Sequence, residues 1–290
     1  MALRDYIDMH VHTTASDGQY SPVQIVEMAA ELGLGGVAIT DHDTTAGVVE
    51  AEAAALGCSI KLLPGIEIST VAAGKDVHVL GYFTNNKDEQ WQHRIAQLGA
   101  TREARNSMLI DKLNELGISI TWDEVKAVSG EDGSVGRPHF AEVLIKKGIV
   151  KTKQQAFDEY LGEHGKAFVQ PRRIHPTEAF QWIREAGGVC VLAHPGLYND
   201  ESLVEELLAA GPDGVEVNHS DHTEQQIERY SRLAEKYGLI ATSGSDFHGA
   251  NEDGSTFHGS LGSVVARLSV YDQLLELHRQ RAGSLGFIKD

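Results

Sequence analysis

Short apolar runs rich in β-branched residues alternate with segments of helical periodicity between residues 6 and 82. Ser21 and Gln24 fit a capping box that opens a helix with Pro22 in its first turn, and Gly33 ends that helix. This alternation predicts an α/β fold. The expected strands are 6–10, 36–40, 61–63, 67–70 and 77–82, and the expected helices are 22–33 and 45–56.

The alternation stops after residue 88, because the pattern up to about residue 165 predicts consecutive helices without a strand between them. About seven strands in the whole chain favour a barrel. The sequence therefore predicts a barrel domain formed by residues 1–84 and 170–290, with residues 85–169 inserted as a helical subdomain that caps the substrate. The later strands are expected at 188–193, 214–218 and 239–242, separated by helices at 201–210 and 223–237.

The formal net charge of −17 excludes a protein that wraps long nucleic acid, because affinity for the backbone comes from many Lys and Arg contacts. A small anionic substrate remains possible if positive charge is concentrated locally. No apolar run approaches the roughly 18 residues of a membrane span. Cys58 and Cys190 are not a disulfide framework. These features favour a cytoplasmic protein without an obligate protein partner.

Fourteen histidines is a high number for 290 residues, and several of them fall in or directly after predicted strands. In a βα barrel, the carboxyl ends of the strands form the catalytic face. The histidines at these positions are His10, His12, His42, His78, His194 and His248, and the carboxylates at comparable positions are Asp8, Asp17, Asp41, Asp43, Glu67 and Asp246.

Each of these residues also has a structural interpretation. His10 and His12 point to one side of an extended segment, but this spacing alone is common without a metal. Asp17 fits an ordinary Ser-Asp-Gly turn, and His78 fits a hydrogen-bonded core histidine. Glu67 is a stronger indicator, because a charge inside an apolar run is costly unless a cation neutralises it. Together the residues predict a site for two or three divalent ions; without a thiolate among the ligands, Mn²⁺, Fe²⁺ or Zn²⁺ is suitable.

Five short motifs carry a resemblance to the PHP superfamily (polymerase and histidinol phosphatase), which covers about residues 4–82 and 188–267. They are His10-Val11-His12 with Ser16-Asp17-Gly18, Thr40-Asp41-His42-Asp43, Gly65-Ile66-Glu67, Val191-Leu192-Ala193-His194-Pro195 and Ser245-Asp246-Phe247-His248. The resemblance implies a distorted (β/α)7 TIM-like barrel and a metal-dependent phosphoesterase, with Mn²⁺ as the leading ion. It further implies hydrolysis by a water molecule that the metal activates, with His194, Asp246 and His248 at the catalytic centre.

The resemblance also implies how the ligands are shared among three ions. The first ion is assigned to His10, His12, Glu67 and Asp246; the second to Glu67, His78 and His194; and the third to Asp17, His42 and His248.

One of these ligands departs from the pattern of a PHP branch. Asp17 stands where the histidinol phosphatase branch tends to have histidine, which makes histidinol phosphate a less favoured substrate.

The predicted insertion contains candidates for binding a second phosphate. Arg102 and Arg105 share one helical face, although an ordinary solvated face fits their spacing equally well. In the loop 133–139, Ser134 and Gly136 lead into a helix whose free N–H groups suit phosphate, with Arg137 beside them; a plain capped turn is the alternative. Lesser candidates for substrate contact are His219 and His222, and also Arg172 and Arg173, for which a surface role fits as well.

The arrangement of motifs and insertion resembles a stand-alone PHP branch that includes 3′,5′-nucleoside bisphosphate phosphatases and a 5′–3′ exoribonuclease acting on short RNA. The leading hypothesis is therefore removal of the 3′-phosphate from a nucleoside 3′,5′-bisphosphate. Exonucleolytic cleavage of short, 5′-phosphorylated RNA or DNA is the closest alternative. A non-catalytic PHP module that binds metal only to stabilise its fold is an alternative of another class.

Overall fold

The computed structural model describes residues 3–129, 134–250, 254 and 256–287. The strands are β1 (Tyr6–Asp8), β2 (Gly36–Ile39), β3 (Lys61–Ala72), β4 (Lys75–Tyr82), β5 (Val189–Leu192), β6 (Gly214–His219), β7 (Ile240–Gly244) and β8 (Ala266–Arg267). The helices are α1 (Pro22–Glu31), α2 (Val48–Cys58), α3 (Glu89–Glu115), α4 (Trp122–Ser129), α5 (Arg137–Lys146), α6 (Lys153–Ala156), α7 (Pro176–Glu185), α8 (Glu201–Ala209), α9 (Glu224–Tyr237) and α10 (Leu268–Ser284). Short turns of other helix types are η1 (Leu3–Asp5), η2 (Phe157–Leu161) and η3 (Pro195–Tyr198).

The strands form one 8-stranded sheet in the order β7-β6-β5-β4-β3-β2-β1-β8. The sheet curls until the segments after β1 and β7 meet, where Met9 N donates to Ser243 O and Asp246 N donates to His10 O. His12 N then donates to Phe247 O at 2.9 Å. The result is the predicted α/β fold with a distorted, nearly closed barrel.

One long strand replaces two of the predicted ones. The sequence predicts a break at Pro64 and Gly65, but β3 runs without interruption from Lys61 to Ala72. Pro64 is tolerated because it pairs with Ile39 at the last position of the β2–β3 ladder, beyond which β3 pairs with β4. Three further elements, α7, α10 and the short β8, were not predicted.

Strand β4 runs antiparallel to both β3 and β5, which distorts the barrel. This direction brings the first half of β4 beside the second half of β3, with His78 opposite Ser69. Glu67 and His78 therefore lie within paired strands. Both positions agree with the predicted strands 67–70 and 77–82, which contain these two residues.

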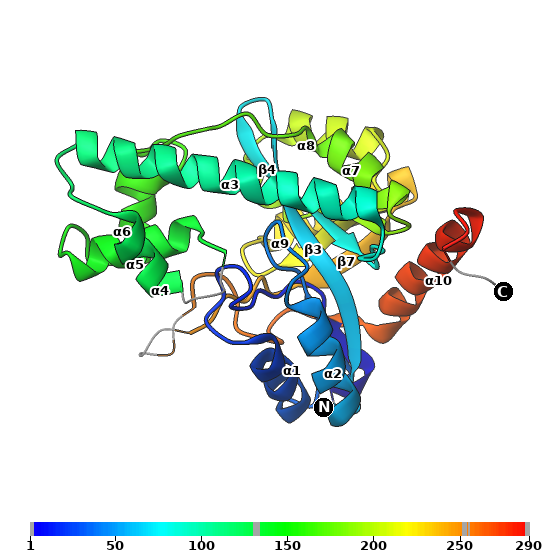
Figure 1. Ribbon diagram of the computed structural model, residues 1–290. Helices are drawn as coiled ribbons and strands as arrows, with labels where there is room; N and C mark the ends of the chain where they lie inside the picture. Colours follow the sequence, from blue (N-terminus) through cyan, green and yellow to red (C-terminus); the bar gives the residue numbers. More distant parts are fainter. Residues whose placement is uncertain (1–2, 130–133, 251–253, 255, 288–290) are drawn as a thin grey trace.

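The helices of the middle of the chain pack around a hydrophobic core of their own. Phe140, Leu144 and Leu161 are fully buried in it, and Leu109 and Leu113 of α3 cover it. Figure 1 shows α3 running across the molecule, with α4, α5 and α6 grouped beneath one of its ends and α1 and α2 at the bottom of the view. No strand falls in the described part of residues 85–169. The exact division into a barrel and an insertion stays a prediction.

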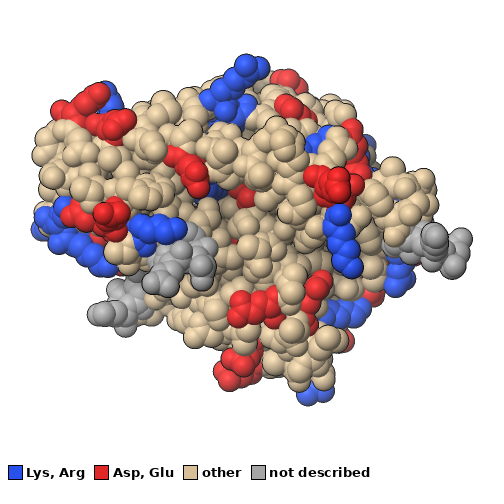
Figure 2. Space-filling view, in the orientation of Figure 1, with Lys and Arg blue, Asp and Glu red and all other residues tan. Residues whose placement is uncertain are grey.

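None of the helices in the described part of the chain combines the length and apolar character needed to cross a membrane. On the face shown in Figure 2, Lys and Arg stand in small groups beside acidic side chains. Positive and negative side chains are therefore interspersed on this face.

Candidate metal centre

The segments that follow β2, β5 and β7 each contain a residue with a strained backbone. Asp43, His194 and Asp246 have φ of 56°, 24° and 54°, in the left-handed region that non-glycine residues rarely adopt. Backbone hydrogen bonds hold two of them, since Asp43 N donates to Glu67 O and Asp246 N donates to His10 O. Strain of this kind, about 1–3 kcal/mol per residue, is concentrated at functional sites. The three segments therefore mark one end of the barrel as the candidate site.

The first predicted ligand set converges there. The ligand atoms of His10, His12, Glu67 and Asp246 lie within 4.8 Å of one another, and all four residues are buried. His10 Nε2 lies 3.4 Å from Glu67 Oε1 and 3.3 Å from Asp246 Oδ1. His12 Nε2 lies 3.3 Å from Glu67 Oε2 and 3.1 Å from Asp246 Oδ1. The four side chains surround one position suitable for a cation.

Glu67 also faces the second predicted set. His78 Nδ1 and His194 Nε2 lie 2.8 and 3.0 Å from Glu67 Oε1. His42 Nδ1 lies 2.9 Å from the other oxygen, Oε2, and so contacts Glu67 as well as the third set. The carboxylate of Glu67 is thus placed to bridge two ions.

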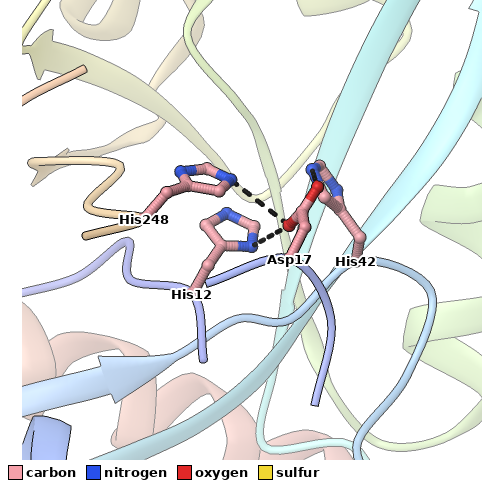
Figure 3. A group of neighbouring side chains, drawn as sticks. All are labelled: His12, Asp17, His42 and His248. Carbon is pink, nitrogen blue, oxygen red and sulfur yellow. Dashed lines mark ion pairs between the residues drawn. The ribbon is translucent and has the colours of Figure 1, made fainter. Parts of the chain in front are cut away.

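The third set gathers around Asp17, as Figure 3 shows. His248 Nε2 lies 3.4 Å from Asp17 Oδ1, and His42 Nε2 lies 3.9 Å from Asp17 Oδ2. His12, which the sequence assigned only to the first ion, also approaches, with Nδ1 3.9 Å from Asp17 Oδ1. The first and third metal positions are therefore adjacent, and His12 borders both of them.

The donor set fits divalent cations. Eight buried atoms of the predicted ligands make no hydrogen bond to the described residues, although buried polar atoms are nearly always hydrogen-bonded. Imidazole and carboxylate without thiolate suit Mn²⁺, Fe²⁺ or Zn²⁺. The eight atoms are His10 Nε2, His12 Nε2, Asp17 Oδ1, His42 Nδ1, Glu67 Oε2, His78 Nδ1, His194 Nδ1 and Asp246 Oδ1.

Electrostatics favours the metal-binding protonation state at some of the ligands. Burial alone raises the pKa of Glu67, but the neighbouring imidazoles of His78 and His42 hold it well below its usual value. Burial lowers the pKa of His194 to about 4, against the opposing effect of Glu67. Burial lowers the pKa of His42 to about 4 in the same way. An ionised carboxylate and a neutral imidazole are the forms that ligate a metal.

Burial lowers the pKa of His12, but Asp246 and Glu67 outweigh burial and raise it to about 10, and the carboxylates around His10 raise its pKa well above the usual value. A cation therefore has to displace a proton from these two histidines.

Several buried carboxylates position the ligands. Glu216, in β6, accepts from His10 Nδ1 at 3.1 Å and from His194 N at 2.8 Å. Asp41 accepts from Ser16 Oγ at 2.6 Å and from Thr13 N at 2.8 Å. Sequence reasoning missed Glu216; its signal is a charge inside the apolar run of β6, like that of Glu67 in β3. A partner on the second ring nitrogen fixes the orientation of a ligating histidine.

A cavity of about 160 Å³ lies over the predicted ligands, and Arg102, Arg105 and Arg137 line its other side. Arg102 donates to Asp43 Oδ2 from Nε and Nη2 at 2.9 and 2.7 Å. Arg137 pairs with Asp76 at 2.5 Å. Within the described part of the chain, Arg105 donates only to the side-chain oxygen of Asn106, at 3.2 and 2.8 Å.

The other predicted contacts lie around this cavity without lining it. Ser134 N donates to Ala15 O, and Gly136 N donates to His139 Nδ1, so neither N–H group is free. A side chain at Gly136 would come within 2.5 Å of Asp17 Oδ2, which explains the glycine. Gly133 lies outside the described residues.

The two histidines after β6 have different surroundings. His219 Nε2 lies 3.3 Å from Asp246 Oδ2, beside the centre. His222 donates from Nδ1 to Val217 O and accepts at Nε2 from Gly196 N, which is a structural role. His258, which the sequence did not single out, does line the cavity, with Nδ1 2.6 Å from Asp221 and Nε2 3.5 Å from Asp246.

Comparison with known proteins agrees with this geometry. The PHP domain model matches residues 8–249. A 5′-3′ exoribonuclease of Haemophilus influenzae is 37% identical over 246 residues, which cover 83% of this chain and 89% of the relative. A 3′,5′-nucleoside bisphosphate phosphatase of Chromobacterium violaceum is 32% identical over 253 residues, which cover 86% of this chain and 89% of the relative.

Solved structures show the same fold. A predicted metal-dependent phosphoesterase of Bifidobacterium adolescentis superposes with a TM-score of 0.84 at 33% identity, covering 93% of this chain and 96% of its own. The matched region, residues 8–249, contains every predicted metal ligand. The chain therefore belongs to the PHP-domain family of metal-dependent phosphoesterases.

Proposed function

We propose that this phosphoesterase removes the 3′-phosphate from a nucleoside 3′,5′-bisphosphate, for example converting adenosine 3′,5′-bisphosphate to AMP and phosphate. In this proposal the metal centre binds the 3′-phosphate that is cleaved, and the arginines across the cavity bind the 5′-phosphate that stays on the product. The observation that carries the proposal is the buried guanidinium of Arg105, which has no acidic partner among the described residues and lines the same cavity as the predicted ligands.

Arg105 is only 7% exposed, and no carboxylate of the described residues lies within ion-pair distance of it. Burial and the neighbouring cations Arg102 and Arg137 lower the pKa of Arg105 well below its usual value. A buried cation among cations is unfavourable unless an anion compensates it. Phosphate is the anion that a guanidinium binds best, through two parallel hydrogen bonds.

The charges around Arg105 match a phosphate monoester. Arg102 pairs with Asp43, while Arg137 and Arg173 share Asp76. Within this group four guanidiniums face two carboxylates, which leaves two positive charges uncompensated; the other carboxylates that line the cavity, Asp17 and Asp246, are predicted metal ligands. A phosphate monoester carries about −1.5 to −2 at neutral pH. This local surplus stands out in a chain of net charge −17.

Different side chains have different roles in the proposed reaction. Bound divalent ions, for which we propose Mn²⁺ in two or three positions, neutralise charge on the phosphoryl oxygens and activate water. His10, held through Nδ1 by Glu216, keeps Nε2 directed at the first position. Arg105 and Arg137 orient the substrate through its second phosphate, so that the 3′-phosphate faces His194, Asp246 and His248.

Exonucleolytic cleavage of short 5′-phosphorylated RNA or DNA is the second candidate. The Haemophilus influenzae relative bears the name of a 5′-3′ exoribonuclease and matches this chain at an identity similar to that of the phosphatase. Both reactions cleave a phosphoester at a ribose 3′-oxygen while a 5′-phosphate is held elsewhere. A non-catalytic module is disfavoured, because every predicted ligand lies at the centre.

The test is phosphate release and product analysis by purified, Mn²⁺-loaded protein. The substrates are adenosine 3′,5′-bisphosphate, 3′-AMP, histidinol phosphate and a 5′-phosphorylated trinucleotide. We expect the bisphosphate to have the highest kcat/KM, with 3′-AMP much slower because it lacks the 5′-phosphate. Preference for the trinucleotide would make the chain an exonuclease. Absence of turnover on all four by fully metallated protein would support the non-catalytic module.

A further inference from the structure

A second cleft, of about 670 Å³, adjoins the cavity over the metal centre. Ser69, Arg102 and Arg105 line both cavities, so the arginines form their common border. The cleft is walled by α3, by the segment 171–175 and by α7, and none of the predicted metal ligands lines it. Its volume lies in the range of small-molecule sites, about 300–1,000 Å³. The cleft therefore extends the binding space from the arginines in a direction away from the metal ligands.

The lining of the cleft is positively charged. Arg172 and Arg173 join Arg102 and Arg105, while Asp43 and Glu178 are the only carboxylates among the described lining residues. Asp43 is already paired with Arg102. Arg172 is exposed, and no ion pair joins it to a described residue. Arg173 is paired with Asp76, so Arg105 and Arg172 are the lining guanidiniums without a carboxylate partner among the described residues, and they favour an anion.

The remaining lining residues suit a bound small molecule. Leu98, Ile174 and Trp182 provide an apolar wall, and Gln97 and Thr101 provide polar groups near the opening. Arg94 stacks on the Trp182 ring, 5.1 Å from its centroid, which holds the indole in place. An apolar wall with a few polar and cationic groups is the usual composition of a ligand site.

We propose that this cleft binds an anionic group attached to the 5′-phosphate of the substrate. The chain then also hydrolyses nucleoside 3′-phosphates whose 5′ end carries a diphosphate. This inference rests on the proposed function, because the 5′-phosphate must lie at Arg105 for its substituent to enter the cleft. In the reaction the bond between phosphorus and the ribose 3′-oxygen breaks. Water supplies a hydroxyl group to phosphorus and a proton to that oxygen, and the 5′-anhydride stays intact.

Binding of the nucleotide products tests the cleft without catalysis. By isothermal titration calorimetry we expect ADP to bind about tenfold more tightly than AMP, since an additional charge-assisted contact contributes about 1.5 kcal/mol. Arg172→Ala should remove most of this difference, and Thr101→Trp, which fills the cleft, should remove all of it while AMP affinity persists. Arg232→Ala, an exposed arginine that pairs only with Glu228 on α9, is the matched control.

Kinetics completes the test. Adenosine 3′-phosphate 5′-diphosphate should be hydrolysed to ADP and phosphate with a KM below that of adenosine 3′,5′-bisphosphate. Arg172→Ala should raise the KM of the diphosphate about tenfold and leave the bisphosphate unchanged. Equal affinity for ADP and AMP would overturn the inference even if the bisphosphate is a good substrate. No turnover of the bisphosphate would instead refute the proposed function, and tighter binding of ADP would still support the cleft.

Discussion

Two buried arginines on one face of α3 should respond oppositely to the same substitution. Arg102 and Arg105 are 6% and 7% exposed and line the same cavity. Arg102 donates to Asp43 and Ser69, whereas Arg105, among the residues that the structure describes, donates only to the amide oxygen of Asn106. Methionine at either position retains most of the apolar stem and removes the charge. The pair of variants therefore separates a structural guanidinium from a functional one.

The expected magnitudes follow from the partners. Arg102→Met leaves the Asp43 carboxylate buried and unpaired, which lowers the free energy of unfolding by about 3–5 kcal/mol. Arg105→Met leaves no carboxylate unpaired and removes a poorly compensated buried charge, so the free energy of unfolding should rise by about 1 kcal/mol. The same variant loses charge-assisted bonds to the second phosphate that contribute about 3 kcal/mol, a fall of about a hundredfold in kcat/KM for the bisphosphate.

The assays are urea denaturation, metal analysis and phosphate release from adenosine 3′,5′-bisphosphate and 3′-AMP. For Arg105→Met, metal content and the rate on 3′-AMP should match those of the unmodified protein. Destabilisation of Arg105→Met as large as that of Arg102→Met would show that Arg105 has an effective partner in the fold. Unchanged selectivity for the bisphosphate would show that Arg105 does not bind the second phosphate. Either result refutes the reasoning.

Three further predictions concern the supports of the centre and of the barrel. Glu216→Gln should weaken metal binding about 10–100-fold, because Glu216 orients His10 and His194, and calorimetry against the exposed control Glu206→Gln measures it. Chelation of the ions should lower the melting temperature, since ligand at a thousandfold its Kd stabilises by about 4 kcal/mol; an unchanged melting temperature would argue against a bound ion. Asp213→Asn should destabilise the protein by about 2–4 kcal/mol at pH 7. Burial by itself raises the pKa of the Asp213 carboxyl, but its contacts with Arg281, Cys190 N and Arg184 hold the pKa below its usual value of 3.8. A carboxylate whose pKa is lower in the folded state stabilises the fold at pH values above its unfolded pKa, and this stabilisation is lost as the pH falls. Urea denaturation should therefore show that the difference in unfolding free energy between Asp213→Asn and the unmodified protein shrinks below about pH 4. A difference that does not depend on pH would contradict the prediction.

The sequence by itself determined the fold class and most of the candidate ligands. A buried carboxylate between Ile66 and Ile68 is costly unless a cation neutralises it, and an imidazole at the end of an apolar strand, as in His194, is costly unless it is hydrogen-bonded or ligates a metal, so single segments already indicate the chemistry. The capping box of Ser21 and Gln24 likewise lies within one turn and appears in the structure as predicted. Such signals are local, because the cost of burying a charge depends on the run of residues around it.

Only the tertiary structure decided which charges are paired. Arg102 and Arg105 are equivalent by sequence spacing, yet Asp43 comes from a distant segment and reaches only Arg102. A two-residue turn at Ala73 and Gly74 makes β4 antiparallel to β3 and brings His78 to Glu67 locally. His194, in contrast, reaches the same carboxylate only when the barrel forms. Glu216 acquires its role in the same way, because its partners His10 and His194 lie in other strands of the barrel. Ion pairing acts over a few ångströms in space, and residue order along the chain does not fix those distances.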